Sequence, residues 1–241
     1  MSMIHEVFYS RIFGCNVGYN IYLPDGYEAS GESYPVVYHL HGWQCDEYTD
    51  IGIMADICRS RNAITVFPNV TPVPDADGAL AEKMVIEELI PHIDGKYRTI
   101  PTREARSITG FSMGGGMAFA FAVKYHELFS GVTAYAGTYH HFYHPDYSTV
   151  GEPAEKAEGI YRAMMTEQKF DRALYSRYSI IELVMRNADA IRRRLNIVLH
   201  IGTDDILYCD NEIMRLHLEA MDIPHSYVRY EGAAHRLKDI L

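Results

Sequence analysis

The pentapeptide Gly110-Phe111-Ser112-Met113-Gly114 places the tightest constraint on how this chain can fold. Residues 105–109 before it have the composition of a β-strand, and residues 117–125 after it have that of a helix. A G-x-S-x-G sequence between a strand and a helix is typical of a sharp turn that projects the serine hydroxyl from the backbone. Small flanking residues are needed there because the turn brings neighbouring backbones close together. The alternatives are a chance match and glycines that serve packing only.

Strand-like and helix-like segments alternate along the rest of the chain. The 241 residues are 48% hydrophobic, which is enough for a packed core. We expect strands at 7–10, 17–23, 34–40, 63–67, 105–109, 131–136, 196–201 and 226–230, and helices at 48–60, 80–93, 117–125, 179–195 and 209–221. This alternation predicts an α/β fold with a mostly parallel central sheet and helices on both faces. We expect one domain over residues 1–241, with 138–178 as a cap insertion.

The charge and the cysteines narrow the function classes. A net charge of −10 disfavours nucleic acids and anionic membranes as partners. The cysteines lack the spacing of a metal or redox site, so we expect reduced thiols at Cys15, Cys45, Cys58 and Cys209. Residues 1–6 lack the features of a signal peptide, and no stretch is long and apolar enough for a membrane span. We therefore expect a cytoplasmic protein.

A serine nucleophile requires a base and an acid that orients the base. In a parallel sheet, catalytic loops follow the carboxyl ends of the strands. His235 directly follows the last expected strand, whereas the other histidines considered lie inside expected elements or at the opposite edge of the sheet: His39, His126, His200, His217 and His225. Asp204 and Asp205 follow the preceding strand, and their spacing alone does not separate them. The chain order Ser…Asp…His is that of the α/β-hydrolases.

Ester chemistry also requires donors for a developing oxyanion, worth roughly 3–4 kcal/mol each. The backbone N–H of Met113 directly follows the nucleophile and is the first expected donor. The second should come from the loop after the strand at 34–40. Trp43 N–H is our choice there, with Gln44 as the alternative.

Three segments together resemble the putative esterase family of α/β-hydrolases. They are Leu40-His41-Gly42, Gly110–Gly115 and Gly202-Thr203-Asp204-Asp205-Ile206-Leu207-Tyr208. That family includes feruloyl and acetyl-xylan esterases, tributyrin-type esterases and S-formylglutathione hydrolases. The resemblance assigns the acid to Asp205, the nucleophile to Ser112 and the base to His235, and it implies no cofactor. The chain departs from the family in having Trp43-Gln44-Cys45-Asp46 where many members have a glycine-rich turn.

The segment from Tyr135 to Tyr147 is rich in aromatic residues and histidines, and it should overhang Ser112. Aromatic walls would suit a planar acyl group such as a hydroxycinnamate, although an ordinary cap core fits equally well. We expect pocket contributions from His41, Gln44, Tyr139 and His140. No acidic or cysteine partner stands at a fixed spacing from His140, His141 and His144, so no metal is expected.

Three function hypotheses follow. The first is a serine carboxylesterase acting on small acyl esters of acetyl or feruloyl type, on a small molecule or a carbohydrate. The second is a thioesterase or acyltransferase such as S-formylglutathione hydrolase. The third is a non-catalytic binding protein, which the presence of all three candidate residues disfavours. Dinucleotide binding is disfavoured because no G-x-G-x-x-G follows the first strand.

Overall fold

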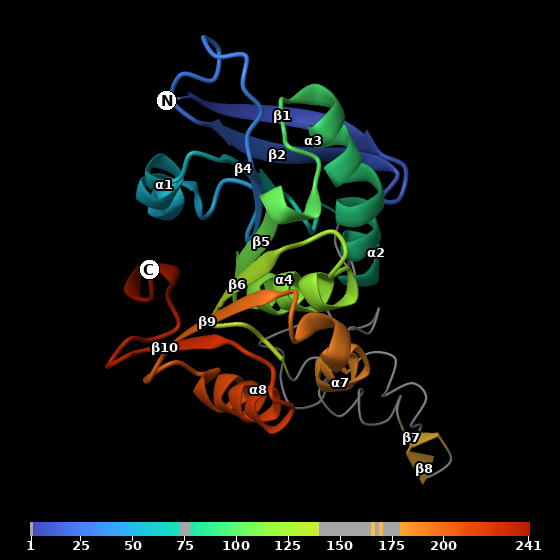
Figure 1. Cartoon of the computed structure of the whole chain (residues 1–241), viewed down its shortest axis with the longest axis vertical. Coiled ribbons are helices and arrows are strands. Elements are labelled where there is room, and N and C mark those ends of the chain that lie inside the picture. The colour runs from blue at the N-terminus through green and yellow to red at the C-terminus, as the bar shows by residue number, and fades with distance from the viewer. Residues whose placement is uncertain (1, 73–77, 140–164, 167–168, 171–178) are drawn as a thin grey trace.

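An eight-stranded sheet forms the centre of the molecule in a computed structural model (Figure 1). The structure describes residues 2–72, 78–139, 165–166, 169–170 and 179–241. The strand order is β1-β2-β4-β3-β5-β6-β9-β10. The strands are β1 (Ser2–Ser10), β2 (Cys15–Leu23), β3 (Val36–Leu40), β4 (Ile64–Pro68), β5 (Arg106–Phe111), β6 (Gly131–Tyr135), β9 (Asn196–Gly202) and β10 (Ser226–Tyr230).

The pairing directions confirm a mostly parallel sheet. β1 pairs antiparallel with β2, and β2 pairs antiparallel with β4. Every other neighbouring pair, from β4 through β3 and β5 to β10, is parallel. Parallel neighbours need crossover connections, and helices supply them. The carboxyl ends of β3, β5, β9 and β10 therefore share one edge of the sheet.

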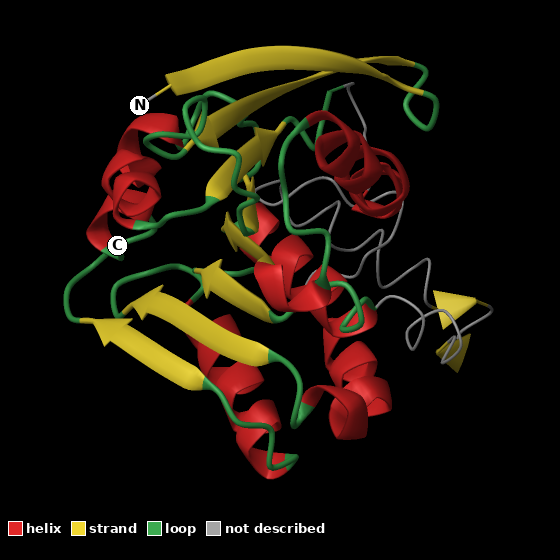
Figure 2. Ribbon diagram, turned by 45° about the horizontal axis from the view of Figure 1, so that its top comes forward, coloured by secondary structure: helices red, strands yellow, loops and turns green. Residues whose placement is uncertain are grey.

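Helices cover both faces of the sheet (Figure 2). α1 (Ile51–Ser60) lies on one face, beside the C-terminal end of the chain, where Met54 and Cys58 pack with Phe67, Leu237 and Ile240. The opposite face carries α2 (Gly78–Lys83), α3 (Ile90–Lys96), α4 (Met113–Lys124), α7 (Ile180–Ile191) and α8 (Tyr208–Ala220). Short 3-10 turns at Arg103–Ala105 and Leu237–Asp239 complete the main body.

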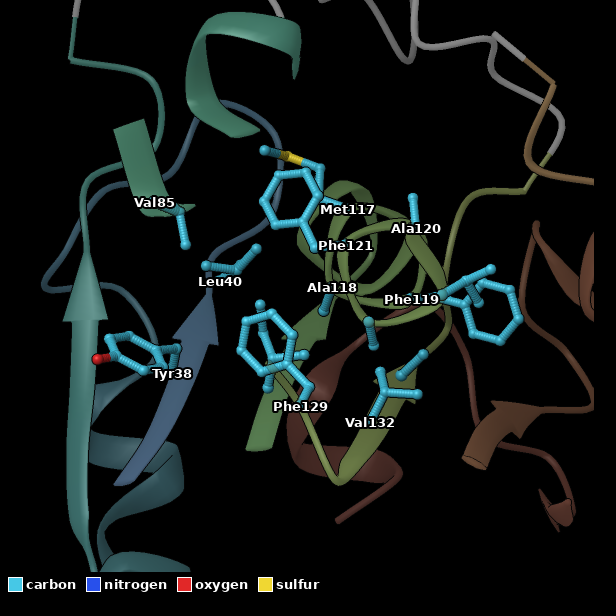
Figure 3. Packing of buried hydrophobic residues seen from close by; sticks show 14 of the residues in the cluster. Tyr38, Leu40, Val85, Met117, Ala118, Phe119, Ala120, Phe121, Phe129 and Val132 are labelled. Carbon is cyan, nitrogen blue, oxygen red and sulfur yellow. The ribbon is translucent and has the colours of Figure 1, made fainter. Parts of the chain in front are cut away.

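α4 is the central helix of the larger core. Its residues from Gly114 to Val123 are all buried, as expected for a helix that is apolar all round. Figure 3 shows Phe119, Phe121 and Phe129 around this helix, with Tyr38 and Leu40 of β3 on the sheet beside them. This packing fixes α4, and hence the turn that precedes it, against the strands.

The expected continuous helix at 80–93 is interrupted. Residues Met84–Leu89 form a π-helical segment between α2 and α3, and the N–H of Ile90 donates to the carbonyl of Val85, five residues back. Pro91 lies in the first turn of α3. Its ring has no N–H and would clash with the carbonyl four residues earlier in a regular helix. The wider turn relieves that clash while Met84 and Leu89 stay buried.

The predicted cap at 138–178 falls largely outside the described residues. Within it, β7 (Met165–Thr166) and β8 (Lys169–Phe170) form a separate antiparallel pair.

All four cysteines carry free thiols. In the described part of the chain, no helix has the length and apolar character needed to cross a bilayer.

Candidate active site

Ser112 lies at the sharp turn between β5 and α4. Its φ of 56° and ψ of −119° are unusual for a residue with a side chain, and such strain is typical of functional sites. The turn is held by the backbone, because Ser112 N–H donates to the carbonyl of Tyr135 at 2.9 Å and Ser112 O accepts from Gly116 N–H at 3.0 Å.

The glycines of the turn permit close contact between backbones. A Cβ at Gly110 would lie 2.2 Å from the carbonyl oxygen of Gly114, and a Cβ at Gly114 would lie 2.1 Å from that of Leu40. No side chain fits at either position. The requirement for small residues predicted from the pentapeptide therefore has a direct cause, which is the contact of the first turn of α4 with β5 and with the end of β3.

Three side chains that are distant in sequence meet at this turn. The Nε2 of His235 lies 2.9 Å from Ser112 Oγ, and its Nδ1 lies 2.9 Å from both carboxylate oxygens of Asp205. An ionised carboxylate only accepts hydrogen bonds, so we assign the imidazole proton to Nδ1. Nε2 is then free to accept the serine proton. A hydroxyl, an imidazole and a carboxylate in this order can activate the hydroxyl as a nucleophile.

The acid and the base follow the carboxyl ends of β9 and β10. Asp205 follows β9, and its carboxylate is inaccessible to solvent, whereas Asp204 is exposed. The backbone N–H of Leu207 donates to Asp205 Oδ1 at 2.7 Å and orients the carboxylate. His235 follows β10, and a Cβ at Gly202 would lie 2.0 Å from the carbonyl oxygen of Ala233, so the two loops pack directly together.

The imidazole of His235 also contacts an aromatic ring. It stacks on the ring of Phe111, with 4.9 Å between centroids and 29° between planes. Sequence reasoning assigned no role to Phe111, although it stands next to the serine within the pentapeptide. Its ring limits the rotation of the imidazole, whose side chain is 23% exposed.

The two expected oxyanion donors come from two segments near the serine: Met113 follows it directly, and Trp43 follows Gly42, where a Cβ would lie 3.6 Å from Ser112 Cβ. Met113 is the first residue of α4, and the helix itself offers no acceptor for its first four N–H groups. Trp43 and Gln44 are the central residues of a turn in which Cys45 N–H donates to Gly42 O at 3.3 Å. Gln44 has a φ of 56°, a conformation that glycine adopts most easily. The non-glycine sequence noted above thus still forms a turn of the glycine type.

His41 is placed differently from the pocket position expected for it. It is 2% exposed, its Nδ1 lies 2.8 Å from Gly42 O, and its Nε2 accepts from Val70 N–H at 3.1 Å. Burial lowers the pKa of His41, which favours the neutral ring that this bonding requires. Both nitrogens are occupied by backbone groups, so His41 supports the turn and presents no free nitrogen to a substrate.

The other three expected pocket residues differ in exposure and placement. Gln44 is exposed, and Tyr139 is buried against Phe119, with 5.2 Å between ring centroids. The Tyr139 hydroxyl is buried and has no hydrogen-bond partner among the described residues. His140 lies outside the described residues, as do His141 and His144. Among the described residues, no cluster of three or more metal-ligating side chains is present.

The comparisons with known proteins identify the family of the chain and its fold. A family model described as "Putative esterase" matches residues 10–237. An esterase of Mycobacterium tuberculosis is 33% identical over 142 residues, which cover 54% of this chain and 31% of that protein. An endo-1,4-beta-xylanase/feruloyl esterase of Xylanibacter ruminicola is 30% identical over 142 residues, covering 51% of this chain and 20% of that protein. The chain thus spans less than a third of the length of these curated relatives.

Solved structures share the fold at low sequence identity. A ferulic acid esterase from Anaeromyces mucronatus, in complex with ferulic acid, superposes with a TM-score of 0.71 at 20% identity, covering 99% of this chain and 86% of that one. An S-formylglutathione hydrolase from Staphylococcus aureus gives 0.72 at 17% identity, covering 98% and 90%. The architecture is therefore shared over nearly the whole chain.

Proposed function

Because the chain belongs to the family described as "Putative esterase" and has the α/β-hydrolase fold, as predicted from its sequence, we propose that it is a serine carboxylesterase. The observation that carries the proposal is the contact of 2.9 Å between His235 Nε2 and Ser112 Oγ, with Asp205 behind the imidazole. A serine without such a base is a weak nucleophile at neutral pH.

In the proposed acylation step, Ser112 Oγ attacks the ester carbonyl carbon and His235 Nε2 takes the hydroxyl proton. The carbonyl oxygen becomes an oxyanion, which the backbone N–H groups of Met113 and Trp43 stabilise. When the intermediate collapses, the bond to the alcohol breaks and the proton on His235 passes to the departing oxygen. The products of this step are the free alcohol and an acyl group bonded to Ser112.

Deacylation repeats these steps with water as the nucleophile. His235 takes a proton from water, and the resulting hydroxide adds to the acyl carbon. When this second intermediate collapses, the bond between the acyl carbon and Ser112 Oγ breaks and the proton on His235 returns to Ser112 Oγ. The products are the carboxylic acid and the free enzyme. Every group in the cycle comes from this chain, the ester or water, so the proposal requires no cofactor.

We propose small acyl esters of acetyl or feruloyl type as substrates, on a small molecule or a carbohydrate. The xylanase/feruloyl esterase relative and the ferulic acid complex support the feruloyl alternative. Thioester hydrolysis of the S-formylglutathione type is the second candidate, supported by the shared fold of the Staphylococcus aureus enzyme. A thioester carbonyl would meet the same nucleophile and the same donors.

The test of the function is to compare the wild-type protein with Ser112→Ala. We expect the wild type to hydrolyse p-nitrophenyl acetate and to react covalently with a fluorophosphonate probe, and we expect Ser112→Ala to lose about 10⁴-fold or more in kcat and all labelling. Near-normal turnover by the variant would refute the assignment. Failure of the wild type to label would favour a binding protein. Rates on methyl ferulate, acetylated xylan and S-formylglutathione then separate the substrate classes.

A further inference from the structure

We propose that Asp50, acting through His39, is a positioning residue that fixes the loop of residues 41–50 for catalysis. This inference rests on the proposed function, because that loop carries Trp43, the second proposed oxyanion donor. Asp50 and His39 are distinct from the three proposed catalytic residues, Ser112, His235 and Asp205.

The loop requires external support. It runs along the nucleophile, since a Cβ built on Gly42 would lie 3.6 Å from Ser112 Cβ. It holds Gln44 at a φ of 56°, an uncommon conformation for a residue with a side chain. Strained backbone of this kind persists only where the surrounding structure holds it in place. A turn bond of 3.3 Å between Cys45 N–H and Gly42 O is a weak constraint by itself.

A buried chain of hydrogen bonds adds to the support that His41 gives to the start of the loop. Asp50 Oδ2 lies 3.0 Å from His39 Nε2, and His39 Nδ1 lies 2.7 Å from Thr109 Oγ1. The exposed fractions of the three residues are 5%, 1% and 2%. Because a carboxylate only accepts, Nε2 carries the proton and Nδ1 accepts from the Thr109 hydroxyl. Both imidazole nitrogens of His39 are thereby hydrogen-bonded to protein side chains.

The position of Asp50 in the chain indicates its role. It is the N-cap residue of α1, where an aspartate side chain ordinarily accepts a hydrogen bond from the second or third N–H of the helix. Here the carboxylate makes no capping bond and turns to His39 on β3 instead. The loop leaves β3 after Leu40 and ends at Asp50, so this contact ties the far end of the loop to the strand from which it started.

The same chain of bonds reaches the strand that carries the nucleophile. His39 and Thr109 are register partners on β3 and β5, and Thr109 stands three residues before Ser112. The bonds therefore connect the loop of Trp43 with the strand that leads to Met113. Since an oxyanion hole requires two donors in a fixed relative position, this connection should contribute to the rate.

The test compares Asp50→Ala with Asp50→Asn by steady-state kinetics on p-nitrophenyl acetate and by thermal unfolding. The amide oxygen of asparagine can still accept from His39 Nε2, whereas alanine cannot. Because displacement by 1 Å can cost 10²-fold, we expect Asp50→Ala to lower kcat by about 10- to 100-fold with KM within about threefold of wild type. Asp50→Asn should keep kcat within about threefold.

The matched control is Ser179→Ala. Ser179 caps α7, where its hydroxyl accepts from Glu182 N–H at 3.3 Å, and the substitution removes a side chain from another helix N-terminus. We expect it to lower the melting temperature without changing kcat. Thr109→Val, which keeps the shape of the side chain and removes the hydroxyl, should lower kcat several-fold and stands in if Asp50→Ala does not fold.

Wild-type kcat in Asp50→Ala or in Thr109→Val would overturn the inference. A loss in Asp50→Asn as large as that in Asp50→Ala would also overturn it, because the effect would then come from the charge and not from the hydrogen bond. A raised KM at unchanged kcat would assign the residue to substrate binding instead. An inactive wild type would refute the proposed function itself, which is a different result from an active wild type with unaffected variants.

Discussion

Replacing Gly114 with alanine should damage both stability and activity. Alanine is the better helix former by about 1 kcal/mol, so the substitution would stabilise α4 if space allowed. The new Cβ, however, would lie 2.1 Å from Leu40 O and 2.5 Å from His41 O. Both obstacles are backbone atoms that cannot rotate away. The first turn of α4 must therefore move by about 1 Å to restore van der Waals contact.

The expected losses in stability and activity follow from this displacement. Overpacking of a tight interior costs typically 1–3 kcal/mol, and a rigid backbone obstacle places Gly114→Ala at about 3 kcal/mol. After the gain in helix propensity, the net loss in unfolding free energy is about 2 kcal/mol, or roughly 4–8 °C in melting temperature for a chain of this size. Because Met113 N–H moves with the turn, we also expect about a 100-fold loss in kcat/KM.

The assays are thermal unfolding and hydrolysis of p-nitrophenyl acetate. Gly52→Ala is the matched control, because Gly52 lies in α1 and a Cβ there meets nothing within 4 Å. That variant should gain up to about 1 kcal/mol in stability and keep its activity. If Gly114→Ala melted at or above the wild-type temperature with unchanged kcat/KM, the steric reasoning would be refuted.

Three further predictions concern the acid, its loop and pH. Asp205→Asn should lower kcat by about 10⁴-fold, whereas the exposed neighbour Asp204→Asn should leave it near the wild-type value; equal effects in steady-state kinetics would contradict the assignment. In Gly202→Ala, a Cβ 2.0 Å from Ala233 O should displace the loop of His235 and lower kcat/KM by at least about tenfold, measured beside the melting temperature. Burial lowers the pKa of His200 to about 4. Below about pH 6.5 the unfolded chain therefore binds a proton at this histidine, whereas the folded protein does not bind it until the pH nears 4. The unfolding free energy should consequently fall by at most about 3 kcal/mol between pH 6.5 and 4. Urea unfolding across that range should show a smaller fall in His200→Gln.

The order of elements could be predicted because it depends on local patterns. The pentapeptide at 110–114, the apolar strands and the helical spacing each act over a few residues, and the topology of a parallel sheet then placed Ser112 and His235 at one edge. Spacing alone did not separate Asp204 from Asp205. They are adjacent, and the difference between them is the burial of one side chain and the exposure of the other.

Features that depend on contacts across the fold were not predicted. His39 was considered only as a strand residue, yet it bonds to Asp50, eleven positions away, and to Thr109, seventy positions away. The bond from Val70 N–H to His41 likewise joins two loops. The π-helical segment at Met84–Leu89 has a local signal in Pro91, but a helical hydrophobic pattern conceals it. Each case requires knowledge of side-chain direction or of the neighbouring strand.

The position of β10 at the edge of the sheet has a consequence for heat inactivation. Among the strands that the structure describes, β10 has β9 as its single neighbour, and His235 follows β10 by five residues. Opening of one outer strand requires less free energy than unfolding the whole domain. A brief separation of β10 would carry the imidazole away from Ser112 while the central strands stayed intact. Activity should therefore decline below the melting temperature and return on cooling.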